Sequence, residues 1–181
     1  MKILVVSDIH GSAWYAQKAI EAVEIHKPDQ ILILGDILYH GPRNPLPKDY
    51  CPAKVVELLN PLKDRILAVR GNCDAEVDQM LLKFNIMSDY TVLYLGQRRI
   101  FATHGHLYSP ENLPHMNQGD AFLYGHVHLP KAYKENGIYI LNPGSITLPK
   151  QENPHTYGLL DENSFTILTE DHEVFTSIQF E

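Results

Sequence analysis

The chain has 181 residues, of which 44% are hydrophobic and 20% charged; this length suits one buried core, so we expect a single domain over residues 1–181. Its 15 Lys and Arg stand against 22 Asp and Glu, a formal net charge of −7, and no basic run is present, which excludes a broad nucleic-acid-binding surface. The longest apolar runs fall far short of the roughly 20 residues of a membrane span, and two cysteines are too few for a secreted disulfide scaffold, so we expect a cytoplasmic protein without a signal peptide or membrane contact.

The first part of the chain predicts strands that alternate with helices. Ser12 is a suitable cap for the first helix, Pro52 a suitable first residue for the second, and Asp74 a suitable cap for the third. The expected strands are residues 2–6, 30–34 and 65–69, and the expected helices are residues 13–27, 52–59 and 75–84. Right-handed crossovers make such strands parallel and place the loops that follow them at one edge of the sheet, where open α/β sheets bind ligands.

The second part of the chain reads as a series of strands. The turn containing Asn136-Gly137 is a strong hairpin signal. The expected strands are residues 90–95, 99–103, 121–124, 131–134, 138–141, 156–160, 165–168 and 173–180. We expect these strands to form a second, largely antiparallel sheet stacked on the first.

Side chains that bind metals follow directly after five of the apolar runs. In chain order they are Asp8 with His10, Asp36, Asn72, His104, and His126 with His128. Each alone could be a loop cap, a turn residue or a buried imidazole. Five strand ends of this kind, each with a glycine near the ligand, predict a metal centre instead. Carboxylate, amide and imidazole without thiolate suit Mn²⁺, Fe²⁺ or Zn²⁺ better than copper, Mg²⁺ or Ca²⁺.

The residues of these loops resemble the ordered motifs of the calcineurin-like metallophosphoesterases. The stretches that carry the resemblance are Asp8-Ile9-His10, Gly35-Asp36, Gly71-Asn72-Cys73-Asp74, Thr103-His104-Gly105-His106 and Gly125-His126-Val127-His128. The short length and the stretch Asn142-Pro143-Gly144-Ser145 resemble the small bacterial YfcE-type phosphodiesterases within that family. The resemblance implies an α/β fold, a four-layer α/β/β/α sandwich of two mixed sheets.

The same resemblance implies two divalent metal ions. Carried over by position, one ion would take Asp8, His10, Asp36 and His128, and the other would take Asp36, Asn72, His104 and His126. Asp36 would bridge the ions, and a hydroxide held between them would attack phosphorus in line. Mn²⁺ is the metal that we expect first, with Zn²⁺, Fe²⁺, Ni²⁺ and Co²⁺ as alternatives.

One position departs from the family pattern. The family has a histidine after the asparagine, taken to protonate the leaving oxygen, whereas this chain has Cys73 after Asn72. The thiol could be a weak proton donor or only a small packed side chain, and both interpretations stay open. His106 joins Asn72 and Cys73 as a candidate catalytic residue, beside the metal ligands or facing the substrate.

The long loop after Asp36 carries the candidate substrate-binding residues. Arg43 and Asn44 could hold the non-bridging oxygens of a phosphate, or they could be ordinary exposed loop residues.

Hydrolysis of a small phosphodiester is the function that we expect. A diester carries one negative charge where a monoester carries nearly two, and few cations lie near the motifs. The alternative is a catalytically weak scaffold or protein-binding module, because the retromer's phosphoesterase-fold subunit also resembles these enzymes. The filled set of metal-ligand positions favours catalysis. A homo-oligomer is compatible with the sequence, although no stripe of residues marks the face that it would use.

Overall fold

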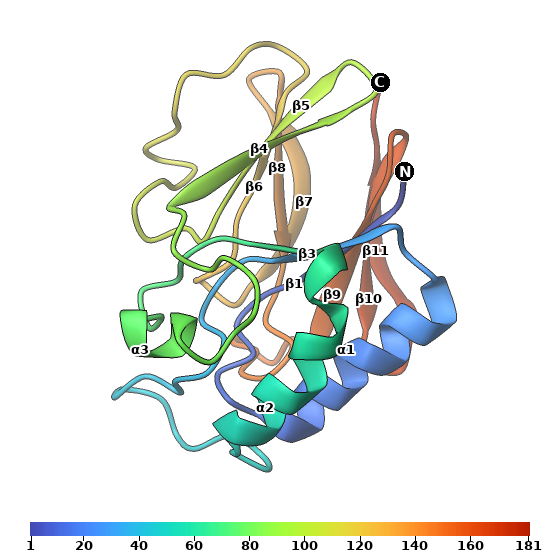
Figure 1. Cartoon of the computed structure of the whole chain (residues 1–181). Helices are drawn as coiled ribbons and strands as arrows, with labels where there is room; N and C mark the ends of the chain where they lie inside the picture. Colours follow the sequence, from blue (N-terminus) through green and yellow to red (C-terminus); the bar gives the residue numbers. More distant parts are fainter.

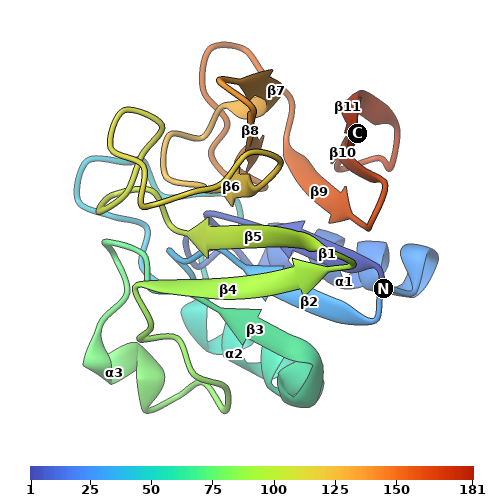
Figure 2. The ribbon, with the colours of Figure 1, turned by 90° about the horizontal axis from the view of Figure 1, so that it is seen from above.

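Two β-sheets packed face to face form the centre of the fold. The computed structural model describes all residues 1–181. One sheet contains β1 (Ile3–Val6), β2 (Gln30–Ile33), β3 (Ile66–Ala68), β9 (Thr156–Leu160), β10 (Ser164–Thr169) and β11 (Val174–Gln179). The other contains β4 (Tyr90–Leu95), β5 (Arg98–Thr103), β6 (Ala121–Leu123), β7 (Pro130–Glu135) and β8 (Ile138–Pro143). Figures 1 and 2 show the second sheet lying across the first, with α1 and α2 on the far side of the first.

The three N-terminal strands pair in parallel, as predicted. In register, Ile3 of β1 lies opposite Gln30 of β2, and Ile31 of β2 lies opposite Ile66 of β3. Side chains alternate across these strands, so Ile3 packs against the second sheet while Leu4 packs against the helices. The carboxyl ends of the three strands therefore meet at one edge, and the loops that leave them begin side by side.

The C-terminal strands correct the expected division between the sheets. The six-stranded sheet has the order β11-β10-β9-β1-β2-β3, because β9 pairs antiparallel with the free edge of β1. The five-stranded sheet, β4-β5-β6-β8-β7, is equally parallel and antiparallel rather than largely antiparallel. Hairpin signals fix only local pairing, and β9 joins the first sheet because its apolar residues Tyr157 and Leu160 fill both faces beside β1.

Two helices cover the outer face of the six-stranded sheet. α1 (Ala13–His26) begins at Ser12, whose hydroxyl accepts the Tyr15 N–H at 3.2 Å, and α2 (Pro52–Leu59) begins at its proline, as the sequence predicts. A 3₁₀ turn, η1 (Asn60–Arg65), follows α2. The small residues Ala16 and Ala19 let α1 lie close to β1 in the larger core cluster. No helix of the molecule is both long and apolar enough to cross a bilayer.

The outer face of the five-stranded sheet is covered by irregular chain. Tyr108 and Met116, from the segment between β5 and β6, pack on the apolar residues Phe101, Phe122 and Ile140. The predicted α/β class with two mixed sheets is confirmed. The layer that a helix would occupy in an α/β/β/α sandwich is filled on this side by residues 104–120, which contain no helix.

The helix expected over residues 75–84 is wrong. Only α3 (Glu76–Gln79) is helical there, and Asp74 does not cap it. The chain beyond α3 turns and bends instead, because Leu82, Phe84 and Ile86 are all buried, a spacing of two that a helix cannot place on one face.

Asp74 instead ties the loops after β2 and β3 together. Its carboxylate, 3% exposed, accepts hydrogen bonds from the N–H groups of Asp36 (2.8 Å), Ile37 (2.8 Å) and Gly71 (2.7 Å). Asp74, the expected helix cap, thus accepts hydrogen bonds from three backbone N–H groups instead. A buried carboxylate with three donors is satisfied only while both loops keep this arrangement.

We expect Asp74→Ala to lower the free energy of unfolding by about 3 kcal/mol, because it strands three buried N–H groups. Asp74→Asn keeps the shape of the side chain and should lower the free energy of unfolding by less than Asp74→Ala. Its amide oxygen can still accept hydrogen bonds, and only its NH2 group faces a backbone N–H that it cannot bind. Urea unfolding measures both, with the exposed Asp64→Ala as the control, for which a change of at most about 0.5 kcal/mol is expected. A stability of Asp74→Ala equal to that of the control would contradict the role of Asp74 as a tie between the loops.

Candidate metal centre

The seven candidate metal ligands lie together at the edge where β1, β2 and β3 end. Five of them adopt a left-handed backbone conformation that residues other than glycine rarely take. The φ angles are 59° for Asp8, 49° for His10, 54° for Asp36, 62° for His126 and 60° for His128. Strain of this kind persists only where surrounding structure enforces it, and it gathers at functional sites. The loops are therefore shaped to bring these side chains inward rather than to minimise local strain.

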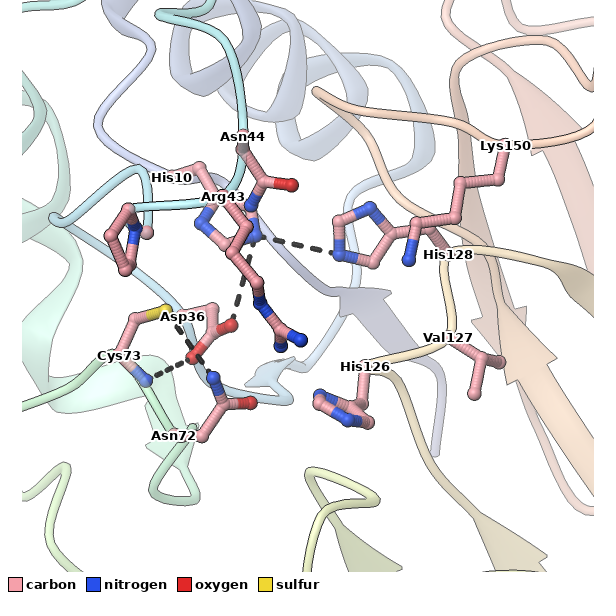
Figure 3. A pocket seen from close by; sticks show the side chains of 12 residues that line it. His10, Asp36, Arg43, Asn44, Asn72, Cys73, His126, Val127, His128 and Lys150 are labelled. Carbon is pink, nitrogen blue, oxygen red and sulfur yellow. Dashed lines mark hydrogen bonds and ion pairs between the residues drawn. The ribbon is translucent and has the colours of Figure 1, made fainter.

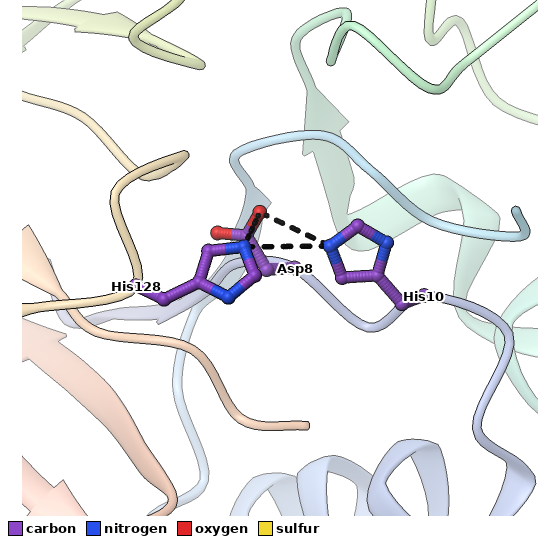
Figure 4. A group of neighbouring side chains, drawn as sticks. All are labelled: Asp8, His10 and His128. Atoms are coloured by element: carbon purple, nitrogen blue, oxygen red, sulfur yellow. Dashed lines mark hydrogen bonds and ion pairs between the residues drawn. The ribbon is translucent and has the colours of Figure 1, made fainter. Parts of the chain in front are cut away.

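Asp8, His10 and His128 form one group of side chains (Figure 4). The Oδ1 atom of Asp8 lies 3.1 Å from Nε2 of His128 and 3.6 Å from Nε2 of His10. The two Nε2 atoms are 3.4 Å apart. All three side chains are buried, so water cannot fully solvate the carboxylate.

Asp36 lies between this group and a second one. Its Oδ2 atom is 3.7 Å from Nε2 of His10 and 3.4 Å from Nε2 of His104. Around His104, the Oδ1 atom of Asn72 lies at 3.0 Å and the Nδ1 atom of His126 at 3.2 Å from Nε2. One carboxylate oxygen thus faces both groups, the placement that a bridging ligand needs.

Hydrogen bonds to the backbone fix the orientation of three imidazoles. The Nδ1 atoms lie 2.8 Å from the Tyr39 carbonyl oxygen for His10, 2.6 Å from that of Leu34 for His104, and 2.6 Å from that of Leu148 for His128. Each Nδ1–H must donate there, so a neutral ring directs an Nε2 lone pair at Asp8 or Asp36. Oδ1 of Asp8 is buried without a hydrogen-bond donor. Lone pairs that face each other in this way repel unless a cation lies between them. Either a proton on Nε2 or a metal ion can supply that positive charge, so the residues fit divalent metal ions.

The pKa values show the same concentration of negative charge. Burial by itself lowers the pKa of His104, but its hydrogen bond with Asp36 and the charges of Asp8 and Asp36 raise it to about 9. The same competition raises the pKa of His10, where Asp8 is the chief partner. Burial and then the positive charge on His104 lower the pKa of His126 to about 4. His126 is thus a neutral imidazole even where His104 is protonated.

A cavity of about 410 Å³ opens above these groups (Figure 3). It is lined by His10, Asp36, Gly41, Pro42, Arg43, Asn44, Asn72, Cys73, His126, Val127, His128 and Lys150. The structure therefore brings both candidate substrate-binding residues, Arg43 and Asn44, to the cavity. The Asn44 amide also donates to the His40 carbonyl oxygen at 2.8 Å, which shapes the loop that carries Arg43.

Cys73 lies on the cavity wall, and its backbone N–H donates to Oδ1 of Asp36 at 2.8 Å. Burial, with the nearby charge of Asp36, raises the pKa of the thiol to about 12, so the side chain is an uncharged thiol at neutral pH. His106 does not line the cavity. Its ring centroid lies 5.4 Å from that of His104 and 6.3 Å from that of His126, so it lies beside two of the candidate ligands.

The sequence analysis assigned no role in the site to several residues that serve it, although Asn142 and Ser145 lie in a stretch that carries the family resemblance. Lys150 lines the cavity, and its only signal is a lone cation five residues after Ser145. The Ser145 hydroxyl donates to the Asp8 carbonyl oxygen at 3.1 Å, and the Asn142 amide donates to the Gly125 carbonyl oxygen at 2.9 Å. Ser7 donates to Oδ2 of Asp8 at 2.5 Å. Ser145 and Asn142 thus orient loops that lie 137 and 17 residues away in sequence, whereas Ser7 orients the neighbouring Asp8.

Comparisons with known proteins bear out the resemblance. The family model of the calcineurin-like phosphoesterase superfamily domain matches residues 1–164. The chain is 48% identical over 168 residues to phosphodiesterase YfcE of Escherichia coli K12, covering 93% of this chain and 91% of that protein. The solved structure of the E. coli phosphoesterase Yfce matches with a TM-score of 0.98 and 46% identity over the whole of both chains.

More distant structures share the fold alone. A Vps29 from Entamoeba histolytica matches with a TM-score of 0.66 and 22% identity, covering both chains completely. The family model spans most of the chain, and all of the motif residues in the loops lie within it. The chain therefore belongs to the calcineurin-like phosphoesterase superfamily.

Proposed function

We propose that this chain is a phosphodiesterase with two divalent metal ions, Mn²⁺ first among the metals expected, that hydrolyses small phosphodiesters. The observation that carries the proposal is the convergence of carboxylate oxygens and imidazole lone pairs in two groups that share Asp36. Two such groups side by side are the arrangement used for in-line displacement at phosphorus. The E. coli relative, 48% identical, is named a phosphodiesterase, which supports the choice of a diester.

The two groups divide the ligands between two ions. Asp8, His10 and His128 with Asp36 would hold one, and Asn72, His104 and His126 with Asp36 the other. When bound, the ions would lower the pKa of a coordinated water and supply positive charge beside the phosphate. The backbone carbonyls that accept each Nδ1–H keep the Nε2 atoms of the imidazoles directed to the positions that the ions would take.

Other residues of the cavity would position the ester. Figure 3 shows the Arg43 side chain reaching over the cavity, with its guanidinium between Asp36 and His126, where it can hold non-bridging oxygens of the phosphate. Asn44 steadies the loop that carries Arg43. Cys73 faces the cavity as a neutral thiol, so its contribution to the leaving oxygen is that of a weak donor.

A role as a scaffold has less support. The similarity to Vps29 structures lies below 25% identity and indicates a shared fold only. The strained backbone at Asp8, His10, Asp36, His126 and His128 has no use in a platform that binds partners on an outer surface. We therefore propose catalysis.

Removal of divalent metals should abolish hydrolysis of bis(p-nitrophenyl) phosphate, because the attacking water has no other means of ionising at neutral pH. Adding Mn²⁺ back should restore the most activity, followed by other transition metals. Release of p-nitrophenolate and elemental analysis of the same samples provide the measurement. Full turnover by protein shown to be free of metal would exclude the proposed mechanism.

Asp36→Asn should reduce activity more than His10→Asn, because Asp36 faces both groups and His10 only one. We expect a loss of about 10³-fold or more for Asp36→Asn, with fewer metal ions retained per chain. Metal content and kcat are measured on both variants, with the exposed Asp64→Asn as the control for charge. Two bound metals and near-normal kcat in Asp36→Asn would show that Asp36 is not the bridge.

Because Cys73 stands where the family has a histidine, we expect the enzyme to depend on esters with good leaving groups. A general acid contributes about 10²- to 10⁴-fold when the leaving alkoxide is poor, so we expect aryl esters to react well and alkyl esters slowly. Cys73→His should raise the rate for alkyl esters more than for aryl esters. Cys73→Ser and Cys73→Ala should change aryl ester hydrolysis only modestly.

The measurement is log kcat against the pKa of the leaving group for the wild type and the three variants. A shallow wild-type dependence, together with a large loss in Cys73→Ala for poor leaving groups alone, would show instead that the thiol already acts as the acid.

A further inference from the structure

The cavity above the metal-ligand groups is lined mainly by polar and charged side chains. Its volume of about 410 Å³ is larger than a single phosphate group needs. No Phe, Tyr or Trp lines it, so its only aromatic rings are the imidazoles of the candidate metal ligands, which are not available as a stacking platform for a nucleobase when they bind metal. The parts of a substrate that flank the reacting phosphate are therefore recognised by charge and hydrogen bonds.

Two cations reach this cavity without a carboxylate partner. Arg43 comes from the loop between β2 and α2, and Lys150 from the loop between β8 and β9. Neither belongs to any of the ion pairs of the molecule, which involve other residues. In a chain with a net charge of −7, two unpaired cations at one cavity indicate an anionic ligand.

The two cations lie at different places in the cavity. Figure 3 shows the Arg43 guanidinium between Asp36 and His126, while Lys150 runs beside His128 at one edge of the group. The Lys150 ammonium beside His128 is suited to bind a substrate group that lies beyond the reacting phosphate.

The backbone at Lys150 is well fixed. Its N–H donates to the His128 carbonyl oxygen at 3.3 Å, and its own carbonyl oxygen accepts the Asn153 side-chain amide at 2.8 Å. The side chain itself makes no hydrogen bond or ion pair within the protein. Its ammonium thus extends to the cavity from a fixed backbone and is free to bind a ligand.

We propose that Lys150 binds a second phosphate group carried on one arm of the ester, so that the preferred substrate is a phosphodiester with a further phosphate. The inference rests on the proposed function and adds the substrate class to it. A terminal phosphate carries nearly two charges and suits the compact, three-donor ammonium of lysine. The diester group, with one charge, is left to the metal ions and Arg43.

The test uses two matched substrates, thymidine 5′-(p-nitrophenyl phosphate) and the same ester with a 3′-phosphate. Both release p-nitrophenolate, so the leaving group is constant. With Mn²⁺ present, wild-type kcat/KM should favour the 3′-phosphorylated ester roughly fivefold, the effect of one partly screened ion pair. The preference should shrink as ionic strength rises.

Three variants separate this role of Lys150 from a general loss of activity. Lys150→Met should abolish the preference for the 3′-phosphorylated ester, and Lys150→Arg should retain most of it. Lys83→Met removes the same charge from an exposed lysine outside the cavity and should keep the wild-type preference.

Equal wild-type kcat/KM for the two esters, or a preference that survives in Lys150→Met, overturns the inference while hydrolysis itself still supports the proposed function. Failure to hydrolyse either ester contradicts the proposed function instead. Calorimetry with thymidine 5′-monophosphate and thymidine 3′,5′-bisphosphate then still tests Lys150: tighter binding of the bisphosphate that Lys150→Met removes supports the inference, and equal affinities in the wild type overturn it.

Discussion

The Asp36 carboxylate is the element on which the rest of the site depends. Its Oδ1 atom accepts the Cys73 N–H at 2.8 Å, so its Oδ2 atom alone faces His10 and His104. The contact requires glycine at position 71, because a Cβ atom there would collide with Oδ1 of Asp36. The ends of β2 and β3 must therefore pack backbone against backbone, which their parallel pairing allows.

The site is built at the expense of local stability. Non-glycine residues with left-handed backbone conformations each cost of order 1 kcal/mol, and the buried Oδ1 atom of Asp8 has no hydrogen-bond donor. The apolar residues between the two sheets and beneath the helices supply the compensating stability. Divalent ions would relieve the repulsion in the folded state only, so metal binding would also stabilise the fold.

Local patterns predicted the parts of the fold that depend on neighbours in sequence. The apolar runs before Asp8, Asp36 and Asn72 predicted three parallel strands whose loops meet, and the structure confirms the parallel order. The predicted helix after Asp74 is wrong because two amides of the β2 loop and one near Asn72 claim its carboxylate. Local propensity predicts Asp74 to be a helix cap, whereas the backbone N–H groups that it binds lie up to 38 residues away in sequence.

The sequence by itself determined which side chains could bind metal and that their strands end at one edge, since residue type and hydrophobic period are local properties. Only the tertiary structure decided that one oxygen of Asp36 faces both groups, that β9 extends the first sheet, and that Lys150 reaches the cavity. These features arise between segments far apart in sequence. Their geometry is set by the packing of the two sheets, and no short stretch of sequence encodes that packing by itself.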